Sequence, residues 1–280
     1  MLPGILIAAA AARLAAAGFP SGKVDARLLL AHAMGVDVTQ LAIARKVTPA
    51  QAAHFHELVG RRADGVPVQH LTGVAYFRHE TLQVGPGVLV PRPETEGLVQ
   101  LVIDWIGRGD VNQPLMIDLG TGSGAIALAL SHEIAGYVAA VEQSQTAFEY
   151  AKRNLEGNVE LRLGDWCDAF CDLDGTVDVV VANPPYIPSG CVLPSDVADH
   201  DPAEALFAGV DGLAALRSIV PVAARLLRPG GLLACEHDDT QWQSAPAVIE
   251  ASGAFTQVTD HRDLAGRPRY VTAERATDQR

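Results

Sequence analysis

The spacing of hydrophobic residues divides the chain into a helical first part and a second part in which strands and helices alternate. Up to about residue 70, apolar side chains recur at helical spacing, and a glycine closes each of the first two segments. Thr48 followed by Pro49 is a typical helix start, because threonine caps free N–H groups and proline suits the first turn. We therefore predict a small helical bundle, with helices at Ile5–Ala17, Asp25–Met34 and Thr48–Arg62.

Two short runs of strand-forming residues follow this bundle and predict a β-hairpin. The runs are Val74–Phe77 and Thr81–Val84, and a Gly-Pro-Gly turn comes after them at residues 85–87. We expect this hairpin to link two domains. The predicted parts of the chain are residues 1–72, 73–90 and 91–280. The third part is expected to open at Pro91–Glu96 with a helix that runs to about Ile106.

From residue 115 onward, short apolar runs alternate with stretches of helical spacing. This alternation is typical of a parallel sheet that carries helices on both faces. The sequence therefore predicts an α/β domain of the doubly wound, Rossmann-like class behind the helical domain. The predicted strands are Leu115–Asp118, Tyr137–Val141, Val159–Leu163, Val177–Ala182 and Leu232–Glu236. The predicted helices are Ala125–Glu133, Thr146–Leu155 and Leu213–Leu227, the last capped by the Arg-Pro-Gly-Gly segment at 228–231.

A glycine-rich loop joins the first of these strands to the helix that follows it. Three glycines at the alternate positions 120, 122 and 124 let the backbone turn tightly and come close to a ligand. Glu142 ends the next strand, where a carboxylate can accept the two hydroxyl groups of a ribose. The spacing also satisfies a looser dinucleotide pattern, so a nicotinamide cofactor is an alternative, as is a plain strand-to-helix turn. Asp118 favours S-adenosylmethionine, because a carboxylate ahead of the glycines disfavours a pyrophosphate but suits the ammonium of a methionine moiety.

Asp165 and Trp166, which follow the third predicted strand, are candidates for holding the adenine of such a cofactor. Asp165 can accept a hydrogen bond from the edge of the base, and Trp166 can cover its face. Tryptophan is also often simply buried. A core tryptophan beside a surface aspartate is therefore the alternative interpretation.

The tetrapeptide Asn183-Pro184-Pro185-Tyr186 carries the predicted chemistry, because it stands directly after a predicted strand. Two prolines at a strand end stop the sheet and make the loop rigid. The nitrogen of an amide or aryl amine is a poor nucleophile, but Asn183 Oδ1 and the Pro184 carbonyl can hold its two N–H groups. Tyr186 can stack on the same planar group. Orientation of this nitrogen toward a sulfonium methyl group then lowers the barrier, and neither a His nor a Cys nucleophile is required.

Together these motifs resemble the protein-(glutamine-N5) methyltransferases of peptide chain release factors, the HemK/PrmC family. The resemblance spans roughly residues 5–275 and also rests on Pro67–Gly73, Val90–Glu96, Asp201–Leu206, Gly209–Leu213 and Arg262–Arg267. It implies a seven-stranded class I methyltransferase domain, S-adenosylmethionine as methyl donor, and a helical domain that helps to dock the release factor. The implied substrate is the glutamine of the Gly-Gly-Gln tripeptide. The chain departs from the family at Glu142, where aspartate is usual, and at Cys235–Asp238, where a glycine is more common.

The residue patterns and the resemblance together give a set of predicted site residues. The predicted cofactor-binding residues are Asp118, Gly120, Thr121, Gly122, Ser123, Gly124, Glu142, Asp165, Trp166 and Asn183. The predicted substrate site is Asn183, Pro184, Pro185, Tyr186 and Arg92, with Asn183, Pro184 and Tyr186 as the catalytic residues. The resemblance puts the Arg92 segment at the methionine end of the pocket. No metal is expected, because the four cysteines complete no zinc-binding set.

The distribution of charge weighs against nucleic acid as the substrate. Residues 1–95 hold nine Lys and Arg against six Asp and Glu, whereas the remainder holds 12 against 27, a net charge of −15. Cationic side chains bind phosphate backbones, so an adenine-N6 methyltransferase, which shares the tetrapeptide, is disfavoured. The sequence also leaves open a ribosomal-protein glutamine methyltransferase, an NAD-dependent oxidoreductase and a catalytically silent scaffold. We expect a cytoplasmic enzyme, because the chain shows neither a membrane span nor the charged start of a signal peptide.

Overall fold

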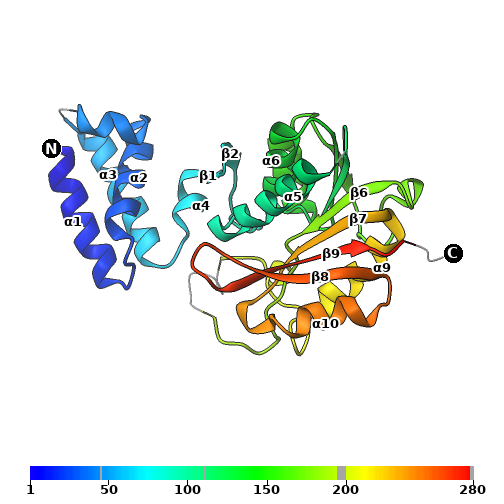
Figure 1. Ribbon diagram of the computed structural model, residues 1–280. Helices are drawn as coiled ribbons and strands as arrows, with labels where there is room; N and C mark the ends of the chain where they lie inside the picture. The colour runs from blue at the N-terminus through cyan, green and yellow to red at the C-terminus, as the bar shows by residue number, and fades with distance from the viewer. Residues whose placement is uncertain (45, 110, 194–199, 278–280) are drawn as a thin grey trace. The chain divides into compact units, whose positions relative to one another are not determined.

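The computed structural model describes residues 1–44, 46–109, 111–193 and 200–277 of the chain. Two compact units are present: the first is built mainly from Met1–Val74, and the second contains Ala75–Gln83, Gly87–Val192 and the chain from Pro202 onward. Figure 1 follows the chain from the first unit, in blue, to the C-terminal strands, in red. The three-part division with boundaries at residues 72 and 90 stays a prediction. Within the described ranges, no helix has the length and apolar character needed to cross a membrane.

Helices form the first unit, as its hydrophobic pattern predicts. Its elements are α1 (Pro3–Ala16), α2 (Gly22–Met34), the 3₁₀ helix η1 (Val38–Ala42), α3 (Pro49–Ala63) and α4 (Val68–Thr72). Thr48 caps α3, because its side chain accepts a hydrogen bond from Gln51 N. The core between the helices is apolar, with Leu14, Leu29 and Phe55 fully buried. The predicted helical bundle is confirmed, and η1 and α4 are additional to the prediction.

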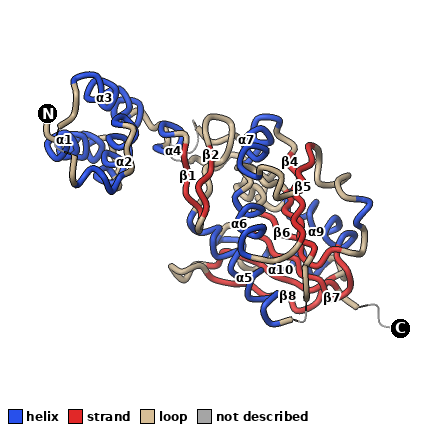
Figure 2. The backbone as a smooth tube through the Cα atoms, turned by 90° about the horizontal axis from the view of Figure 1, so that it is seen from above, coloured by secondary structure: helices blue, strands red, loops and turns tan. Residues whose placement is uncertain are grey.

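A seven-stranded sheet organises the second unit, with the strand order β5-β4-β3-β6-β7-β9-β8. The strands are β3 (Leu115–Leu119), β4 (Tyr137–Glu142), β5 (Glu160–Leu163), β6 (Val177–Ala182), β7 (Leu227–Glu236), β8 (Phe255–Arg262) and β9 (Pro268–Arg275). Neighbours from β5 to β7 pair in parallel, whereas β9 is antiparallel to both of its neighbours. Figure 2 shows these strands, in red, gathered between helices. The predicted Rossmann-like, seven-stranded class is confirmed.

Helices cover both faces of this sheet. α5 (Glu96–Arg108) contacts α6 (Ala125–Glu133), α6 contacts α7 (Gln145–Leu155), and α9 (Ala214–Leu226) contacts α10 (Ser244–Ala251). Figure 1 shows α5 and α6 above the sheet and α9 and α10 below it. The connections through α6, α7 and α9 each pack a helix against the two strands that they join. The predicted hairpin is present as a separate two-stranded sheet of β1 (Val74–Phe77) and β2 (Glu80–Gln83).

The segment 228–231, predicted as a helix cap, lies within strand β7 in the structure. Leu227 already pairs with Val177, and the register shifts before Val179 pairs with Leu232. Gly230 has a φ of +78° and supplies the left-handed conformation that this irregular stretch needs. The predicted cap is therefore wrong, because these turn-forming residues make a bulge inside the strand.

The carboxyl ends of β3, β4 and β6 come together at one edge of the sheet. β3 lies between β4 and β6, because the chain moves outward to β5 and then returns to the other side of β3. Open α/β sheets bind ligands at such a switch point. The glycine loop after β3, Glu142 at the end of β4 and Asn183 after β6 therefore meet at the same edge.

Candidate active site

A pocket opens at this edge of the sheet, where open α/β sheets bind their ligands. Several predicted site residues line it: Gly120, Gly122, Glu142, Trp166, Asn183, Pro184 and Pro185. The rest of the wall comes from three segments that were not predicted: Gly87, Val88 and Leu89; Gln143, Ser144 and Ala147; and Pro202, Glu204 and Ala205. The predicted residues outside the wall are Asp118, Thr121, Ser123, Gly124, Asp165, Tyr186 and Arg92.

The glycine loop is held against the end of β4 by its own backbone. The N–H groups of Gly120 and Thr121 both donate to the Val141 carbonyl, each over 3.0 Å. Gly120 and Gly122 have φ values of +75° and +58°, which residues with a Cβ rarely adopt. A Cβ on Gly120 would also lie 3.2 Å from the Trp166 ring, whereas one on Gly122 would meet no other part of the protein within 4 Å. The space beside Gly122 is therefore available to a ligand.

Asp118 is a buried carboxylate at the end of β3. Its Oδ2 accepts a hydrogen bond from Thr121 Oγ1 over 2.6 Å, and the backbone N–H of Ala127 in the first turn of α6 also lowers its pKa. Oδ1 is buried and has no hydrogen-bond partner of good geometry among the described residues. Burial raises the pKa of Asp118 to about 7, and the negative charge of Glu142 acts in the same direction. A buried, unpartnered carboxylate oxygen is costly unless a donor or a cation compensates for it. Asp118 is only 1% exposed and does not line the pocket, so its contact with an ammonium group stays a prediction.

Glu142 connects the end of β4 to the glycine loop. Its Oε2 accepts a hydrogen bond from Gly122 N and its Oε1 accepts one from Ser144 N, each over 2.8 Å. Burial raises the pKa of Glu142, and the charge of Glu204, on the pocket wall, adds to this effect. Each carboxylate oxygen can accept a second hydrogen bond. Glu142 therefore retains the capacity to hold two neighbouring hydroxyl groups.

Trp166 forms part of the pocket wall beside Gly120. Its Nε1 donates to Ser218 Oγ over 3.1 Å, which restricts the ring, and the side chain also packs against the core. Asp165 is exposed and accepts a hydrogen bond from Cys167 N over 2.8 Å, so its carboxylate stabilises the local turn. Trp166 thus combines a core contact with a position in the pocket, and contact of Asp165 with a base stays a prediction.

Asn183, directly after β6, begins a chain of hydrogen bonds that leads away from the pocket. Its Nδ2 donates to Thr95 Oγ1 over 3.0 Å, and Thr95 Oγ1 donates to Glu236 Oε2 over 2.8 Å. The Tyr186 hydroxyl donates to the other oxygen of the same carboxylate over 3.4 Å. Glu236 ends β7 and is only 2% exposed, and burial raises its pKa to about 7. Asn183 is therefore tied to three residues that do not line the pocket.

Tyr186 belongs to this chain of hydrogen bonds, and neither Tyr186 nor Arg92 lines the pocket. Burial raises the pKa of the Tyr186 hydroxyl, and the negative charge of Glu236 raises it further. The hydroxyl therefore stays protonated and able to donate. The positive charge of Arg92 acts on the same pKa in the opposite direction. Stacking by Tyr186 and a pocket role for Arg92 remain expectations from the sequence.

Thr95 and Glu236 are the residues of this network that sequence reasoning did not assign. Thr95 stands in a segment that carries the family resemblance, Val90–Glu96, whereas Glu236 stands in Cys235–Asp238, where the chain departs from the family. The available signal is the position of Glu236 at the end of β7, directly after the apolar run at residues 232–235. A carboxylate at the end of such a strand is buried and needs a partner, but the sequence does not say which residue provides it.

Two family profiles match the chain. A profile described as PrmC N-terminal domain matches residues 6–73, and one described as methyltransferase domain matches residues 113–267. The first range lies within the helical unit. The second range contains the glycine loop, Glu142 and Asn183, and it ends in the turn between β8 and β9.

Three curated relatives show how far the similarity extends. The release factor glutamine methyltransferase of Mycolicibacterium smegmatis is 49% identical over 274 residues, which is 96% of each chain. That of Streptomyces coelicolor is 48% identical and covers 96% of this chain and 97% of its own. A 4-amino-L-phenylalanine/4-methylamino-L-phenylalanine methyltransferase of Streptomyces pristinaespiralis is 39% identical, covering 85% and 83%. With both family profiles matched and relatives of this identity over nearly its full length, the chain belongs to the release factor glutamine methyltransferase family.

Proposed function

We propose that this protein transfers the methyl group of S-adenosylmethionine to the side-chain amide nitrogen of the glutamine in the Gly-Gly-Gln motif of release factors. The observation that carries the proposal is the position of Asn183. Its Nδ2 donates a hydrogen bond to Thr95 Oγ1, so Oδ1 is the atom of the amide that can accept a hydrogen bond in the pocket. A fixed acceptor at a rigid strand end is what a planar NH₂ group needs for orientation.

The residues at the carboxyl edge of the sheet fit the methyl donor. Glu142 offers two carboxylate oxygens to ribose hydroxyls, and Trp166 offers ring surface to the adenine. The buried, unpartnered Oδ1 of Asp118 suits an ammonium group. When bound, S-adenosylmethionine supplies a methyl group on a positively charged sulfur, which leaves as a neutral thioether.

Asn183 and Pro184 hold the substrate nitrogen. The two N–H groups of a primary amide donate to Asn183 Oδ1 and to the Pro184 carbonyl. The nitrogen forms the new N–C bond as the C–S bond breaks, and one N–H proton then leaves to solvent, so the product is a neutral N-methyl amide. No strong base is required, and among the described residues of the pocket wall there is neither a histidine nor a cysteine.

The assignment of a protein substrate rests on the relatives and on the first unit. The relatives from M. smegmatis and S. coelicolor are named for release factor glutamine and match 96% of this chain, its helical part included. The first unit, which contains the PrmC N-terminal domain match, is proposed to dock the release factor. The S. pristinaespiralis relative is named for an aryl amine, which is also a planar NH₂ group. Both substrate classes therefore belong in the test.

A labelling experiment tests the proposal directly. The protein is incubated with isotope-labelled S-adenosylmethionine and, in separate reactions, with release factor, ribosomal protein, DNA or 4-amino-L-phenylalanine. Mass spectrometry then maps the label. We expect one methyl group on the glutamine of the Gly-Gly-Gln motif. Label on DNA, on a ribosomal protein or on the aryl amine alone would overturn the assignment of the release factor.

A matched pair of asparagine variants tests the role of Asn183. Asn183→Ala is expected to lower methyl transfer roughly 100-fold or more, because an oriented polar group at the reaction centre is lost. Its affinity for S-adenosylmethionine should change little. Asn158→Ala, at an exposed position, is the control for the substitution itself. Unchanged turnover in Asn183→Ala would refute the amide-holding role.

A further inference from the structure

Thr95 has a single hydroxyl hydrogen, and this fixes how the Asn183 amide is turned. Thr95 Oγ1 lies 2.8 Å from Glu236 Oε2 and 3.0 Å from Asn183 Nδ2. An ionised carboxylate can only accept hydrogen bonds, so Thr95 gives its hydrogen to Glu236. The threonine oxygen can then only accept from Asn183. The amide must therefore offer its NH₂ group to Thr95 and turn Oδ1 away from it.

We propose that Glu236 is a positioning residue that acts through Thr95 and keeps Asn183 Oδ1 available as the acceptor for the substrate nitrogen. This inference rests on the proposed function and assigns roles to two residues outside the pocket wall. The oxygen and nitrogen of a carboxamide have almost the same shape, so packing alone does not select one orientation. A flipped Asn183 would present an NH₂ group to the NH₂ group of the substrate. Two donors would then face each other and the substrate would not be held.

The positioning role requires the ionised form of Glu236. A protonated Glu236 can donate to Thr95, which frees the threonine hydrogen for Asn183 Oδ1 and permits the flipped amide. The groups that face Glu236 are Thr95 and Glu94 from the 3₁₀ helix η2 (Pro93–Thr95), Tyr186 after β6, and Arg269 and Tyr270 on β9. Burial raises the pKa of Glu236, while the Thr95 hydrogen bond and the Arg269 charge lower it, with a result of about 7. The network therefore changes state near neutral pH.

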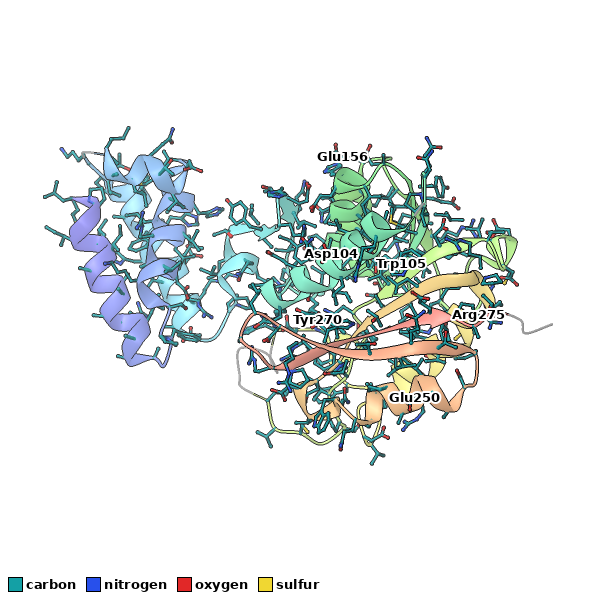
Figure 3. All side chains as sticks on the ribbon, in the orientation of Figure 1. Asp104, Trp105, Glu156, Glu250, Tyr270 and Arg275 are labelled. Carbon is teal, nitrogen blue, oxygen red and sulfur yellow. The ribbon has the colours of Figure 1, made fainter. Side chains whose placement is uncertain are left out.

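The backbone beside Thr95 is itself held in place. Tyr270, labelled on β9 in Figure 3, donates its hydroxyl hydrogen to the Glu94 carbonyl over 2.5 Å. Gly97 lies against the same tyrosine, since a Cβ there would overlap Tyr270 Oη. The absence of a side chain at Gly97 thus lets β9 approach the start of α5. These contacts hold the backbone on both sides of Thr95, so the parts of the network that can rearrange are the hydrogen of the Thr95 hydroxyl and the amide of Asn183.

Two substitutions at Thr95 separate its hydroxyl from its volume. Thr95→Val removes the hydroxyl, and we expect kcat to fall up to roughly 100-fold, because the Asn183 acceptor at the reaction centre is then no longer oriented. Thr95→Ser keeps the hydroxyl and should retain most of kcat. Affinity for S-adenosylmethionine, measured by calorimetry, should be nearly unchanged in both variants. Thr256→Val, at an exposed position on β8, is the matched control. An unchanged kcat in Thr95→Val would overturn the proposal.

The pH profile distinguishes positioning from a merely structural contribution. At saturating S-adenosylmethionine, wild-type kcat should fall as the pH drops through about 7, because Glu236 takes up a proton. Thr95→Val should lose this acid limb, since its Asn183 amide no longer responds to Glu236. A variant of purely structural effect would have lower activity and an unchanged profile, and that result would contradict the positioning role.

A spectroscopic readout keeps this test independent of the substrate. In protein labelled with nitrogen-15, the side-chain NH₂ signal of Asn183 is assigned by its absence in Asn183→Ala. This signal should shift with pH near 7 in the wild type and should not shift there in Thr95→Val. Failure of the wild type to methylate a release factor would overturn the proposed function alone. Identical titration of the signal in both proteins would overturn the positioning role, whatever the substrate is.

Discussion

Gly122 donates its backbone N–H to Glu142 Oε2 over 2.8 Å, which joins the glycine loop to the end of β4. Ser144 N donates to the other oxygen over the same distance, so the carboxylate is held in one position before a ligand binds. A preorganised acceptor loses less conformational freedom on binding. Changes at Glu142 are therefore expected to act on cofactor affinity and to leave the orientation of the substrate amide intact.

Glu142→Ala is expected to weaken S-adenosylmethionine binding roughly 10- to 100-fold, because a hydrogen bond to a charged group contributes about 1.5–3 kcal/mol. Glu142→Asp retains the charge one methylene further back and should have a smaller effect. Titration calorimetry measures both affinities. Glu250→Ala, an exposed acid on α10 labelled in Figure 3, serves as the control. Equal affinity in Glu142→Ala and the wild type would show that this acid does not hold the ligand.

The sequence predicts the central strands because these strands are buried on both faces and are therefore mostly apolar. β6 is the clearest case, since five of its six residues are buried. β8 is an edge strand in which exposed polar residues predominate, so its pattern does not distinguish it from a loop. The bulge in β7 differs from the predicted helix cap for another reason. Pro229 and Gly230 are equally common after a helix, and only the pairing with β6 decides between the two.

The candidate site shows the same difference between residues that a local sequence pattern identifies and residues that only the fold brings together. Gly120, Glu142 and Asn183 were predictable because each stands at the end of a strand with a residue type that suits one chemical role. Thr95 and Glu236 are 141 residues apart in the chain, and no local pattern links them. Their contact depends on the fold, which brings the segment before α5 next to the end of β7. Sequence reasoning therefore found the groups expected to touch the ligands and missed those that orient them.

A pair of glycine variants tests why the loop excludes side chains. Gly120→Ala and Gly157→Ala both place a Cβ at positive φ, +75° and +83°, so each should destabilise the fold by about 1 kcal/mol. A Cβ at Gly120 would also lie 3.2 Å from the Trp166 ring, whereas Gly157 has open space around it. Only Gly120→Ala should therefore weaken S-adenosylmethionine binding. Chemical denaturation and calorimetry measure the two effects, and equal affinities would contradict a role for this contact.

The pKa of Asp118, raised by burial to about 7, predicts that cofactor binding depends on pH. In the unfolded chain this carboxyl loses its proton near 3.8, whereas the folded protein without ligand keeps it up to about 7. Its contribution to stability is therefore present at low pH and is lost as the pH rises from about 4 to 7. A bound ammonium favours the ionised form. Affinity for S-adenosylmethionine should accordingly increase as the pH rises through about 7.

Proton release measures this coupling at Asp118. Calorimetry at pH 6.5 or so, in buffers with different heats of ionisation, should show release of a proton when S-adenosylmethionine binds. Asp118→Asn has no proton to release and should lose the dependence on buffer and on pH. Release that persists in this variant would assign the proton to another acid, such as Glu142, whose pKa is also raised by burial.

A buried ion pair in the first unit gives a test of the proposed docking role. Arg62 Nε lies 2.7 Å from Asp25 Oδ2, and the guanidinium stacks 3.8 Å above the Phe19 ring. Asp25 and Arg62 are only 6% and 8% exposed, so removing one charge leaves the other buried without its partner. Such a loss typically costs about 3–5 kcal/mol. Because the first unit is small, this cost is large relative to its expected stability.

Asp25→Ala is therefore expected to unfold the first unit and to raise KM for the release factor about 10-fold or more, while affinity for S-adenosylmethionine stays close to that of the wild type. Thermal unfolding followed by circular dichroism, steady-state kinetics and calorimetry measure the three quantities. The double variant Asp25→Leu with Arg62→Met removes both charges and should recover most of the stability and the wild-type KM. An unfolded first unit with an unchanged KM would show that these helices do not dock the substrate. A parallel loss of cofactor affinity would show that the two units are not functionally separable.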